Sequence, residues 1–245
     1  MAIDMIKIKN VSKFFGEKAA LKNINLEVAT GETLAIIGGS GSGKSTLLRL
    51  MIGLIKPSEG EIWIGDDEIS RLDEDALTKI RLRMGMVFQY SALFDSMTVG
   101  DNVAFGLVEH TDFSEEKISE IVRNKLHQVG LDGVENLMPN ELSGGMKKRV
   151  SLARAIAFEP EIIFYDEPSS GLDPIMTNKI DELIISTQHS MKVTSVVVTH
   201  DMVSACRIAD RIAMIYEGEL IAVDSVEKFK KIQDPRVKEF FRQIN

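Results

Sequence analysis

The stretch GGSGSGKST, residues 38–46, decides the fold of this chain. It follows the apolar run LAII and precedes LLRLMIGL, an order that indicates a strand, a glycine-rich turn and a helix. Gly38, Gly43, Lys44 and Ser45 satisfy the phosphate-binding pattern G-x-x-x-x-G-K-[ST]. A flexible glycine turn is the plainer alternative, but the strand and helix on either side favour a P-loop.

Each residue type in this loop has a use in binding phosphate. Successive backbone N–H groups wrap the oxygens, Lys44 neutralises the β and γ phosphates, and the Ser45 hydroxyl is a ligand for Mg²⁺. We therefore expect the whole loop to contact a bound nucleotide: Gly38, Gly39, Ser40, Gly41, Ser42, Gly43, Lys44, Ser45 and Thr46.

Strand-like runs occur on both sides of the P-loop. Before it, IKIKNV and LKNINLEV are bounded by turns and predict N-terminal antiparallel strands. After it, EIIFYDEP, VTSVVVTHD and RIAMIYEGELIAV alternate with helical stretches near residues 174–189 and 202–209. Strands that alternate with helices predict an α/β fold with a mostly parallel sheet, covered by helices on both faces.

The middle of the chain has a different pattern. From about residue 90 to 158 the strand signals fade, and SEEKISEIVRNKLHQVGL places apolar residues at helical spacing. We interpret residues 90–158 as a helical subdomain inserted into a single domain, between the core segments 1–89 and 159–223. Residues 224–245 are expected to form two short C-terminal helices separated at Asp234-Pro235.

Composition limits the class of protein. The 245 residues can bury one large core, and a net charge of −8 argues against a general nucleic-acid surface. Cys206 is the only cysteine, so no disulfide can form within the chain, which fits a reducing compartment. The apolar runs are far shorter than the roughly 20 residues that span a bilayer, and the N-terminus has no signal-peptide core. We expect a cytosolic protein that reaches a membrane only through a partner.

The run EIIFYDEP ends an expected buried strand with two carboxylates. Asp166 is placed to hold Mg²⁺, directly or through water, and Glu167 to take a proton from an attacking water. An acidic pair after a strand is by itself more often a solvated loop. The P-loop upstream favours the catalytic interpretation.

Two more polar residues follow expected strands. His200 ends VVVTH, where ligands gather in open α/β sheets, and we expect it to position the γ phosphate and the attacking water. A hydrogen-bonded structural histidine is the alternative. Gln89 ends MVFQ at the start of the helical subdomain, where it is a candidate Mg²⁺ ligand that reports the nucleotide state to that subdomain.

The segment LSGGMKKR, residues 142–149, begins an expected helix that runs to Pro160. Glycine costs roughly 1 kcal/mol in a helix, and cations oppose the positive pole of the helix dipole. These choices fit a helix N-terminus that binds an anion through Ser143, Gly144 and Gly145. Ser143 as a simple N-cap is also expected, but capping alone does not explain the glycines and cations.

These motifs together resemble one family. The P-loop, FQ at residues 88–89, LSGG at residues 142–145, EIIFYDEP, SGLDP at residues 170–174 and TH at residues 199–200 resemble the ATP-binding-cassette ATPases, in order and across nearly the whole chain. The resemblance implies a RecA-like core with a helical subdomain. It also implies ATP and Mg²⁺ as cofactors and a head-to-tail homodimer that encloses two ATP molecules.

The resemblance assigns further residues. Phe15 matches the aromatic residue that stacks on adenine, with Phe14 as the neighbouring alternative, and Asp173 matches the loop that communicates across the dimer. The anion at Ser143 would be the γ phosphate of ATP bound by the other subunit. Many cassette ATPases have Gln where this chain has Met146, so here the backbone and the helix dipole are expected to carry that contact.

A narrower likeness is to the ATPase subunits of Mla-type phospholipid transporters. It rests on residues 84–105, LMPNELSGGMKKR, GLDPI and DPRVKEFF. It implies a separate membrane permease, an MCE-domain lipid-binding protein, and a place at the cytoplasmic face of the bacterial inner membrane. The sequence leaves three alternatives undecided: an additional small regulatory subunit, a different transported substrate (amino acid, metal, lipoprotein or drug), and a cassette protein that takes no part in transport.

By that likeness, the permease docks near residues 91–105. Leu93, Phe94 and Met97 offer apolar contacts there, although each is equally suited to the core of the helical subdomain itself. Phe240 and Phe241, in the expected last helix, are candidates for contact with the partner ATPase.

Overall fold

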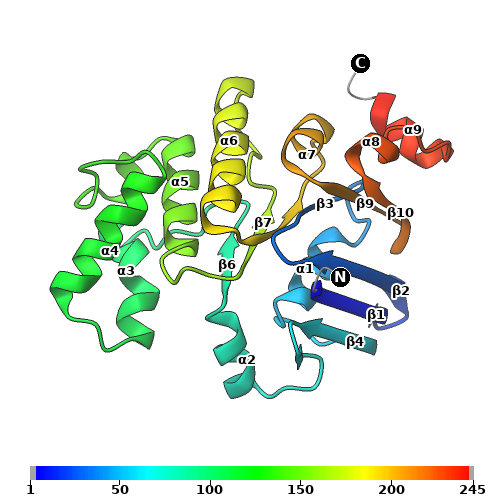
Figure 1. The fold of residues 1–245 in the computed structure, drawn as a ribbon, viewed down its shortest axis with the longest axis horizontal. Helices are drawn as coiled ribbons and strands as arrows, with labels where there is room; N and C mark the ends of the chain where they lie inside the picture. The colour runs from blue at the N-terminus through cyan, green and yellow to red at the C-terminus, as the bar shows by residue number, and fades with distance from the viewer. Residues whose placement is uncertain (1–3, 243–245) are drawn as a thin grey trace.

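The N-terminal residues form a small antiparallel sheet. The computed structural model describes residues 4–242 (Figure 1), and this sheet has the strand order β2-β1-β4-β5. Its strands are β1 (Asp4–Phe15), β2 (Lys18–Ala29), β4 (Glu59–Ile64) and β5 (Asp67–Glu68). Apolar residues on one face of these strands are fully buried, which confirms the predicted N-terminal antiparallel strands.

The second sheet has six strands in the order β10-β9-β3-β8-β7-β6. The strands β3 (Thr33–Ile37), β6 (Met84–Val87), β7 (Ile162–Asp166), β8 (Thr194–Val198) and β9 (Arg211–Tyr216) are parallel. The edge strand β10 (Glu219–Ser225) is antiparallel to β9. Every residue of β3 and β8 is buried, as expected of parallel strands covered on both faces. The predicted α/β class is confirmed.

Side chains of the main sheet alternate between two cores. Leu34 and Ile36 of β3 pack with α1 (Lys44–Met51) and the antiparallel sheet. Ala35 and Ile37, one residue on, face α7 (Met202–Ile208) on the other side. Neighbouring residues of a strand point to opposite faces, so the P-loop strand is fixed between two packed layers. The loop that follows it is therefore held in place from both sides.

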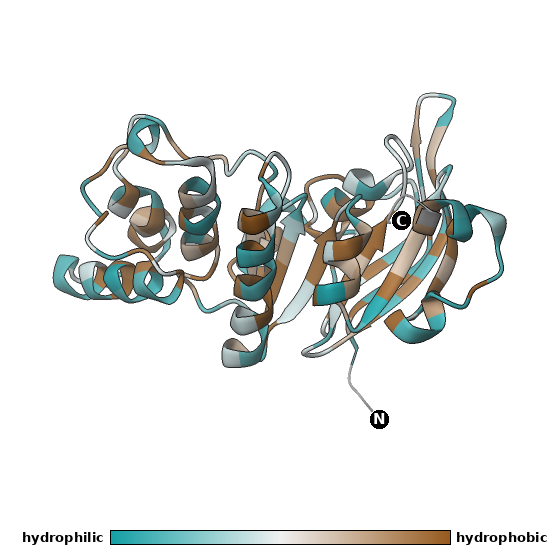
Figure 2. Cartoon of the chain, turned by 90° about the horizontal axis from the view of Figure 1, so that it is seen from above, coloured by the Kyte–Doolittle hydropathy of each residue, from teal (hydrophilic) through white to brown (hydrophobic). Residues whose placement is uncertain are grey.

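The helical part contains α3 (Val99–His110), α4 (Glu115–Gln128), the short 3₁₀ helix η1 (Pro139–Glu141) and α5 (Gly144–Ala155). These helices share a core with α6 (Pro174–Met191) and lie at one end of the molecule in Figure 1. Figure 2 shows apolar and hydrophilic residues on different sides of these helices. Within residues 4–242, no helix is long and apolar enough to cross a membrane.

One expectation about a helix was wrong, and one helix was not predicted. The helix after Ser143 ends at Ala155 and does not reach Pro160, because the chain turns beyond Ile156 and Glu159 has a positive φ of 52°. The structure also contains α2 (Glu74–Arg81), which the sequence patterns did not indicate. Only Leu77 and Ile80 of that helix are buried, so its apolar periodicity is weak.

The C-terminal helices are α8 (Val226–Phe229) and α9 (Pro235–Arg242). Val237 is fully buried, and the rings of Phe229 and Phe241 lie 6.2 Å apart between centroids. Phe240 also packs against this cluster. Phe240 and Phe241, which were candidates for contact with the partner ATPase, therefore pack against the core of their own chain.

Candidate functional site

The P-loop occupies the turn between β3 and α1, with Gly43 directly before the helix. Gly43 has φ 114°, and a Cβ there would lie 2.7 Å from the Leu21 side chain. A Cβ on Gly38 would lie 2.2 Å from the carbonyl oxygen of Ile215. These positions exclude any side chain, because real Cβ atoms do not approach so closely. The glycines thus let the loop fold tightly around its own centre.

Lys44 is almost fully buried at the first position of α1. Its Nζ donates to the carbonyl oxygens of Gly38 at 2.8 Å and Gly39 at 3.1 Å. Burial lowers the pKa of the ammonium, while the carboxylates of Glu167 and Asp166 oppose that change. A cation is therefore aimed into the loop, and phosphate oxygens can replace the carbonyls that now accept from it.

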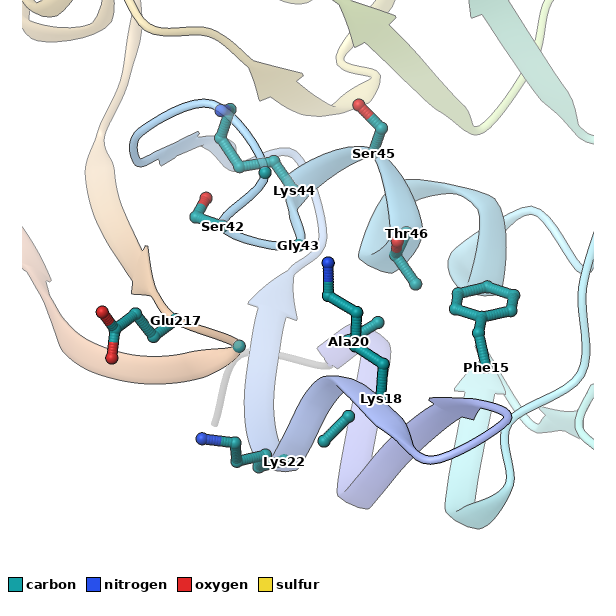
Figure 3. A pocket seen from close by; sticks show the side chains of 13 residues that line it. Phe15, Lys18, Ala20, Lys22, Ser42, Gly43, Lys44, Ser45, Thr46 and Glu217 are labelled. Carbon is teal, nitrogen blue, oxygen red and sulfur yellow. The ribbon is translucent and has the colours of Figure 1, made fainter.

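A cavity of about 490 Å³ opens beside the loop and α1. Figure 3 shows Phe15 and Lys44 at different ends of this pocket, with Lys18 between them. Phe15 is half-exposed and lines the pocket, whereas Phe14 does not line it. Of the predicted loop residues, Gly41 to Thr46 line the cavity, whereas Gly38, Gly39 and Ser40 do not.

The pocket also contains polar residues that sequence reasoning missed. They are Lys18 and Lys22 of β2 together with Glu217 and Gly218. Alternation along β2 places its polar positions outward, but nothing in the sequence shows that this edge faces the P-loop. Gly218 meets the loop through its N–H, which donates to the carbonyl of Ser42 at 3.0 Å.

Asp166 and Glu167 stand at the end of β7, next to the end of β8. Glu167 has a positive φ of 47°, and its N–H donates to the Val198 carbonyl at 2.9 Å. Its carboxylate Oε2 lies 2.8 Å from Nδ1 of His200. The Glu167 side chain is 14% exposed and that of His200 is 67% exposed, so this pair joins a shielded carboxylate to a solvent-facing ring. The structure brings the predicted base and histidine together.

Asp166 lies in a different electrostatic setting from an exposed carboxylate. Burial and then the neighbouring Glu167 raise the pKa of its carboxyl, while Arg49, Lys44 and Lys148 oppose that change. A carboxylate held so close to another carboxylate is stabilised by an added cation. The local chemistry therefore suits a divalent ion.

Gln89 lies two residues beyond the end of β6. Its Nε2 donates to the Ser170 hydroxyl at 3.4 Å, so the side chain reaches the segment that follows Glu167. Among the described residues, no group of three or more His, Cys, Asp or Glu side chains is placed to hold a metal alone. Ser45, Gln89 and Asp166 instead offer a hydroxyl, an amide and a carboxylate, which fits an Mg²⁺ ion that takes its other ligands from phosphates and water.

Ser143 begins α5 as predicted, and its hydroxyl accepts from the Met146 N–H at 3.3 Å. Ser143 and Gly144 are exposed, and Gly145 packs against Met176, whose Cε lies 2.2 Å from where a Cβ on Gly145 would be. Ser143 and Met146 line a separate cavity of about 580 Å³. The chain therefore does not bring its own LSGG turn into the P-loop pocket.

Asp173 caps α6, and its Oδ1 accepts from the N–H groups of Ile175 at 2.9 Å and Met176 at 3.0 Å. Asp173 itself is exposed. Through Met176, the helix that it caps touches the glycine turn of α5.

Comparison with known proteins identifies the family to which the chain belongs. The family described as "ABC transporter" matches residues 21–170, which include the P-loop, Gln89, Ser143 and the Asp166-Glu167 pair. The chain belongs to this ABC transporter family. The match covers more than half of the chain, and Phe15, Asp173 and His200 lie outside the matched range.

Relatives of this ABC ATPase extend the match over nearly the full length. The intermembrane phospholipid transport system ATP-binding protein MlaF of Haemophilus influenzae is 43% identical, over 98% of this chain and 90% of the relative. The chloroplastic protein TRIGALACTOSYLDIACYLGLYCEROL 3 of Arabidopsis thaliana is 42% identical, over 96% and 73%. The probable ribonucleotide transport ATP-binding protein mkl of Mycobacterium leprae is 39% identical, over 96% and 68%.

Solved structures agree with the fold. The dimeric, post-hydrolysis ATP-binding cassette MJ0796, bound to ADP and phosphate, matches with a TM-score of 0.84 and 39% identity, over 91% of this chain and 99% of that one. The cassette cbiO1 of Clostridium perfringens, part of the transporter complex cbiONQ, matches with a TM-score of 0.86 and 30% identity, over 98% and 99%. The chain is an ATPase of the ATP-binding-cassette type.

Proposed function

We propose that this ABC ATPase powers the movement of phospholipid between bacterial membranes, as a homodimer attached to a membrane permease. The observation that carries the proposal is 43% identity to a phospholipid transport ATPase over 98% of the chain. The arrangement of the site supports the hydrolytic role. The names of the relatives support the lipid.

ATP binds with its adenine on Phe15 and its phosphates in the P-loop. Lys44 exchanges the carbonyls of Gly38 and Gly39 for the β and γ phosphates. Lys18 lies along the same pocket, where its ammonium favours the negative charge of the nucleotide. Bound Mg²⁺, with Ser45, Gln89 and Asp166 as its protein ligands, supplies charge stabilisation at the transferred phosphoryl group.

Hydrolysis requires a base at the γ phosphate, and Glu167 is that base. His200 holds the Glu167 carboxylate by the 2.8 Å contact to Nδ1, which leaves the other ring nitrogen free to face the phosphate. The binding site for the γ phosphate is completed by a second copy of the chain, through the exposed Ser143 and Gly144 at the N-terminus of α5. This arrangement explains why the LSGG turn lies outside its own chain's nucleotide pocket.

The permease docks on an exposed apolar surface within residues 91–105, which we define as Phe94 and Phe105. Phe94 is 41% exposed and its ring lies 4.8 Å from that of Phe105. Leu93, by contrast, packs into the helical core and Met97 is half-buried, so the three candidate contacts divide between surface and core. A partner that covers large exposed apolar side chains gains free energy by removing them from water.

Arg154 of α5 supports this docking surface. Its guanidinium donates to the carbonyl oxygens of Ala92 at 2.7 Å and Ser91 at 3.0 Å. It also lies 6.0 Å from the centre of the Phe94 ring. The docking segment is therefore attached to the same helix that begins at Ser143.

The transporter assembly is tested by isolating the tagged chain from its own cell membranes in mild detergent. Mass spectrometry should identify a permease, an MCE-domain protein and bound phospholipid. We propose that this complex holds the chain at the cytoplasmic face of the inner membrane. Recovery of a different transport complex would contradict the lipid assignment. In detergent solution at saturating ATP, added phospholipid should change the ATPase rate of the purified complex, whereas an added pyrimidine ribonucleotide should not. The reverse result would favour the activity named for the mycobacterial relative.

Phe94→Ala tests the docking surface. We expect lipid transport in vesicles to fall by roughly tenfold, because the central aromatic contact is lost, while the ATPase rate of the isolated subunit stays unchanged. Phe113→Ala is the matched control, since Phe113 is 49% exposed, lies between α3 and α4 in the chain, and is not among the residues that define the docking surface. Equal losses in both variants would contradict the assignment, as would loss of folding in Phe94→Ala.

A further inference from the structure

Lys148 is a buried lysine in the second turn of α5 that the proposed mechanism does not use. It is 6% exposed, and its Nζ donates to two backbone carbonyls that belong to other elements. One is the carbonyl of Gln89, and the other is that of Glu167, at 3.4 Å. Three segments far apart in the sequence therefore meet at one ammonium group.

The two carbonyls occupy equivalent places in the sheet. Val87 of β6 pairs with Tyr165 of β7, and Gln89 and Glu167 each lie two residues beyond that pair. Ladder hydrogen bonds between the strands end at this point, so the backbone of both segments needs other partners. Lys148 supplies a donor to both.

The Glu167 backbone is strained, although its N–H donates to the Val198 carbonyl of β8 at 2.9 Å. Its φ of 47° is uncommon for a residue with a side chain and persists only where the surrounding structure holds the backbone in place. The Ser170 N–H donates to the Glu167 carbonyl at 3.1 Å, and Ser170 also accepts from Gln89. The carbonyl that Lys148 contacts is thus part of the turn that sets the direction of the Glu167 carboxylate.

Helix α5, which carries Lys148, is held firmly by its packing. Helix α5 packs closely on β6, because a Cβ on Gly85 would lie 2.6 Å from the carbonyl oxygen of Ala155. The adjacent positions Val150, Ser151, Leu152 and Ala153 are buried. A small rotation of α5 would consequently move the ammonium relative to the ends of β6 and β7.

We infer that Lys148 is a positioning residue, which fixes the Glu167 turn and the Gln89 segment relative to the helix that carries the LSGG turn. The inference rests on the proposed roles of Glu167 and Gln89 in hydrolysis. Lys148 acts through the backbone of these residues. Its removal lowers the rate of hydrolysis more than it weakens ATP binding.

Lys148→Met removes the donor and keeps the approximate length of the side chain. We expect kcat to fall roughly tenfold or more, while the Kd for ATP, measured by calorimetry in EDTA, changes less than about threefold. Lys148→Arg keeps N–H donors and should retain most of kcat. Lys148→Gln replaces Met if the Met variant does not fold. Its side chain is shorter than that of lysine, so kcat should again fall while the Kd for ATP changes little.

Lys125→Met is the matched control. Lys125 is 5% exposed in the same helical part and pairs with Glu159 at 3.0 Å, so its loss disturbs a buried lysine of the same kind away from the site. Equal falls of kcat in the two Met variants, at equal folded fraction, would show that Lys148 only supports the fold and would overturn the inference. A parallel loss of kcat and ATP affinity would overturn it too. Glu167→Gln that still hydrolyses ATP would instead remove the proposed base, and the inference with it.

Discussion

At the residue scale, the catalytic assignment depends on one carboxylate with an unusual backbone. Glu167 is directed by its positive φ and by His200, whereas the preceding Asp166 continues the strand β7. Two neighbouring carboxylates are thereby given different surroundings. Such a division is what acid–base chemistry beside a metal-binding carboxylate requires.

Glu167→Gln keeps the size of the side chain and removes the base. We expect hydrolysis to fall by a factor of roughly 100 or more, while ATP still binds and holds the dimer closed. Size-exclusion chromatography with ATP should therefore show a stable dimer, and the same variant with ADP should run as a monomer. A variant that stays monomeric with ATP would count against the proposed mechanism.

Residues with strict local geometry were the ones that sequence could predict. The P-loop, the Ser143 cap and the end of β7 follow from short motifs in which each residue type has a fixed use. Lys148 could not be predicted, because its two partners lie far from it in sequence. Met146 turns its side chain to the helical core, which sequence alone did not show.

At the element scale, α6 and α7 are joined by a buried carboxylate. Asp181 of α6 is 1% exposed and accepts a short hydrogen bond from the Ser204 hydroxyl of α7, with Arg207 at 3.9 Å. Asp173 caps α6, and Asp201, next to His200, caps α7. Asp181 thus fixes two helices whose N-termini both lie at functional segments.

Asp181→Asn tests the electrostatic cost of this junction. Burial is the main cause that raises the pKa of the Asp181 carboxyl in the folded chain. The folded state therefore binds the proton more tightly than the unfolded state, so stability falls as pH rises from the ordinary pKa through the raised one. Asn lacks this titration but can still accept from Ser204. The melting temperature of the variant relative to the native chain should rise as the pH increases from the ordinary carboxyl pKa of 3.8 through the raised one.

The matching control is Asp173→Asn, because Asp173 is exposed and caps α6 from outside the core. Asn keeps a side-chain oxygen that can accept from the same N–H groups, so this variant measures the effect of an Asp-to-Asn exchange at an exposed helix cap. A pH-independent difference for Asp181→Asn would show that the raised pKa does not contribute to stability.

Elements with strong periodicity were predicted and weak ones were not. Buried strands such as β3, β7 and β8 follow from continuous apolar runs, whereas α2 has too few buried positions to give a pattern. The placement of α9 against Phe229 depends on tertiary packing between segments, which no local signal carries. The boundaries of the helical subdomain at residues 90 and 158 stay predictions.

At the scale of the whole molecule, we propose that the nucleotide site is divided between two chains. Lys44 lines one cavity and Ser143 another, and a symmetric pair of chains would bring each into contact with the partner's half. Each dimer then holds two equal sites. Each site takes its P-loop from one copy and its LSGG turn from the other.

Mixing two inactive variants tests this division. Lys44→Ala destroys the phosphate half and Ser143→Arg the signature half, so both homodimers should be inactive. A mixed dimer has one site with both defects and one with neither, and an equal mixture should recover roughly a quarter of the native ATPase rate. No recovery would indicate that both halves belong to the same chain. Each variant alone, at the total concentration of the mixture, is the control.

Helix α5 joins three functions along its length. Ser143 begins it, Lys148 contacts the strand ends that carry Gln89 and Glu167, and Arg154 holds the segment beneath the permease-docking surface. At 1.5 Å per residue, the first and last of these positions are about 16 Å apart along one axis. The helix is continuous between them, so it can move as one rigid lever. In the proposed transporter, the displacement of the permease-docking surface is then limited by how far the Ser143 end of this helix is displaced when ATP binds.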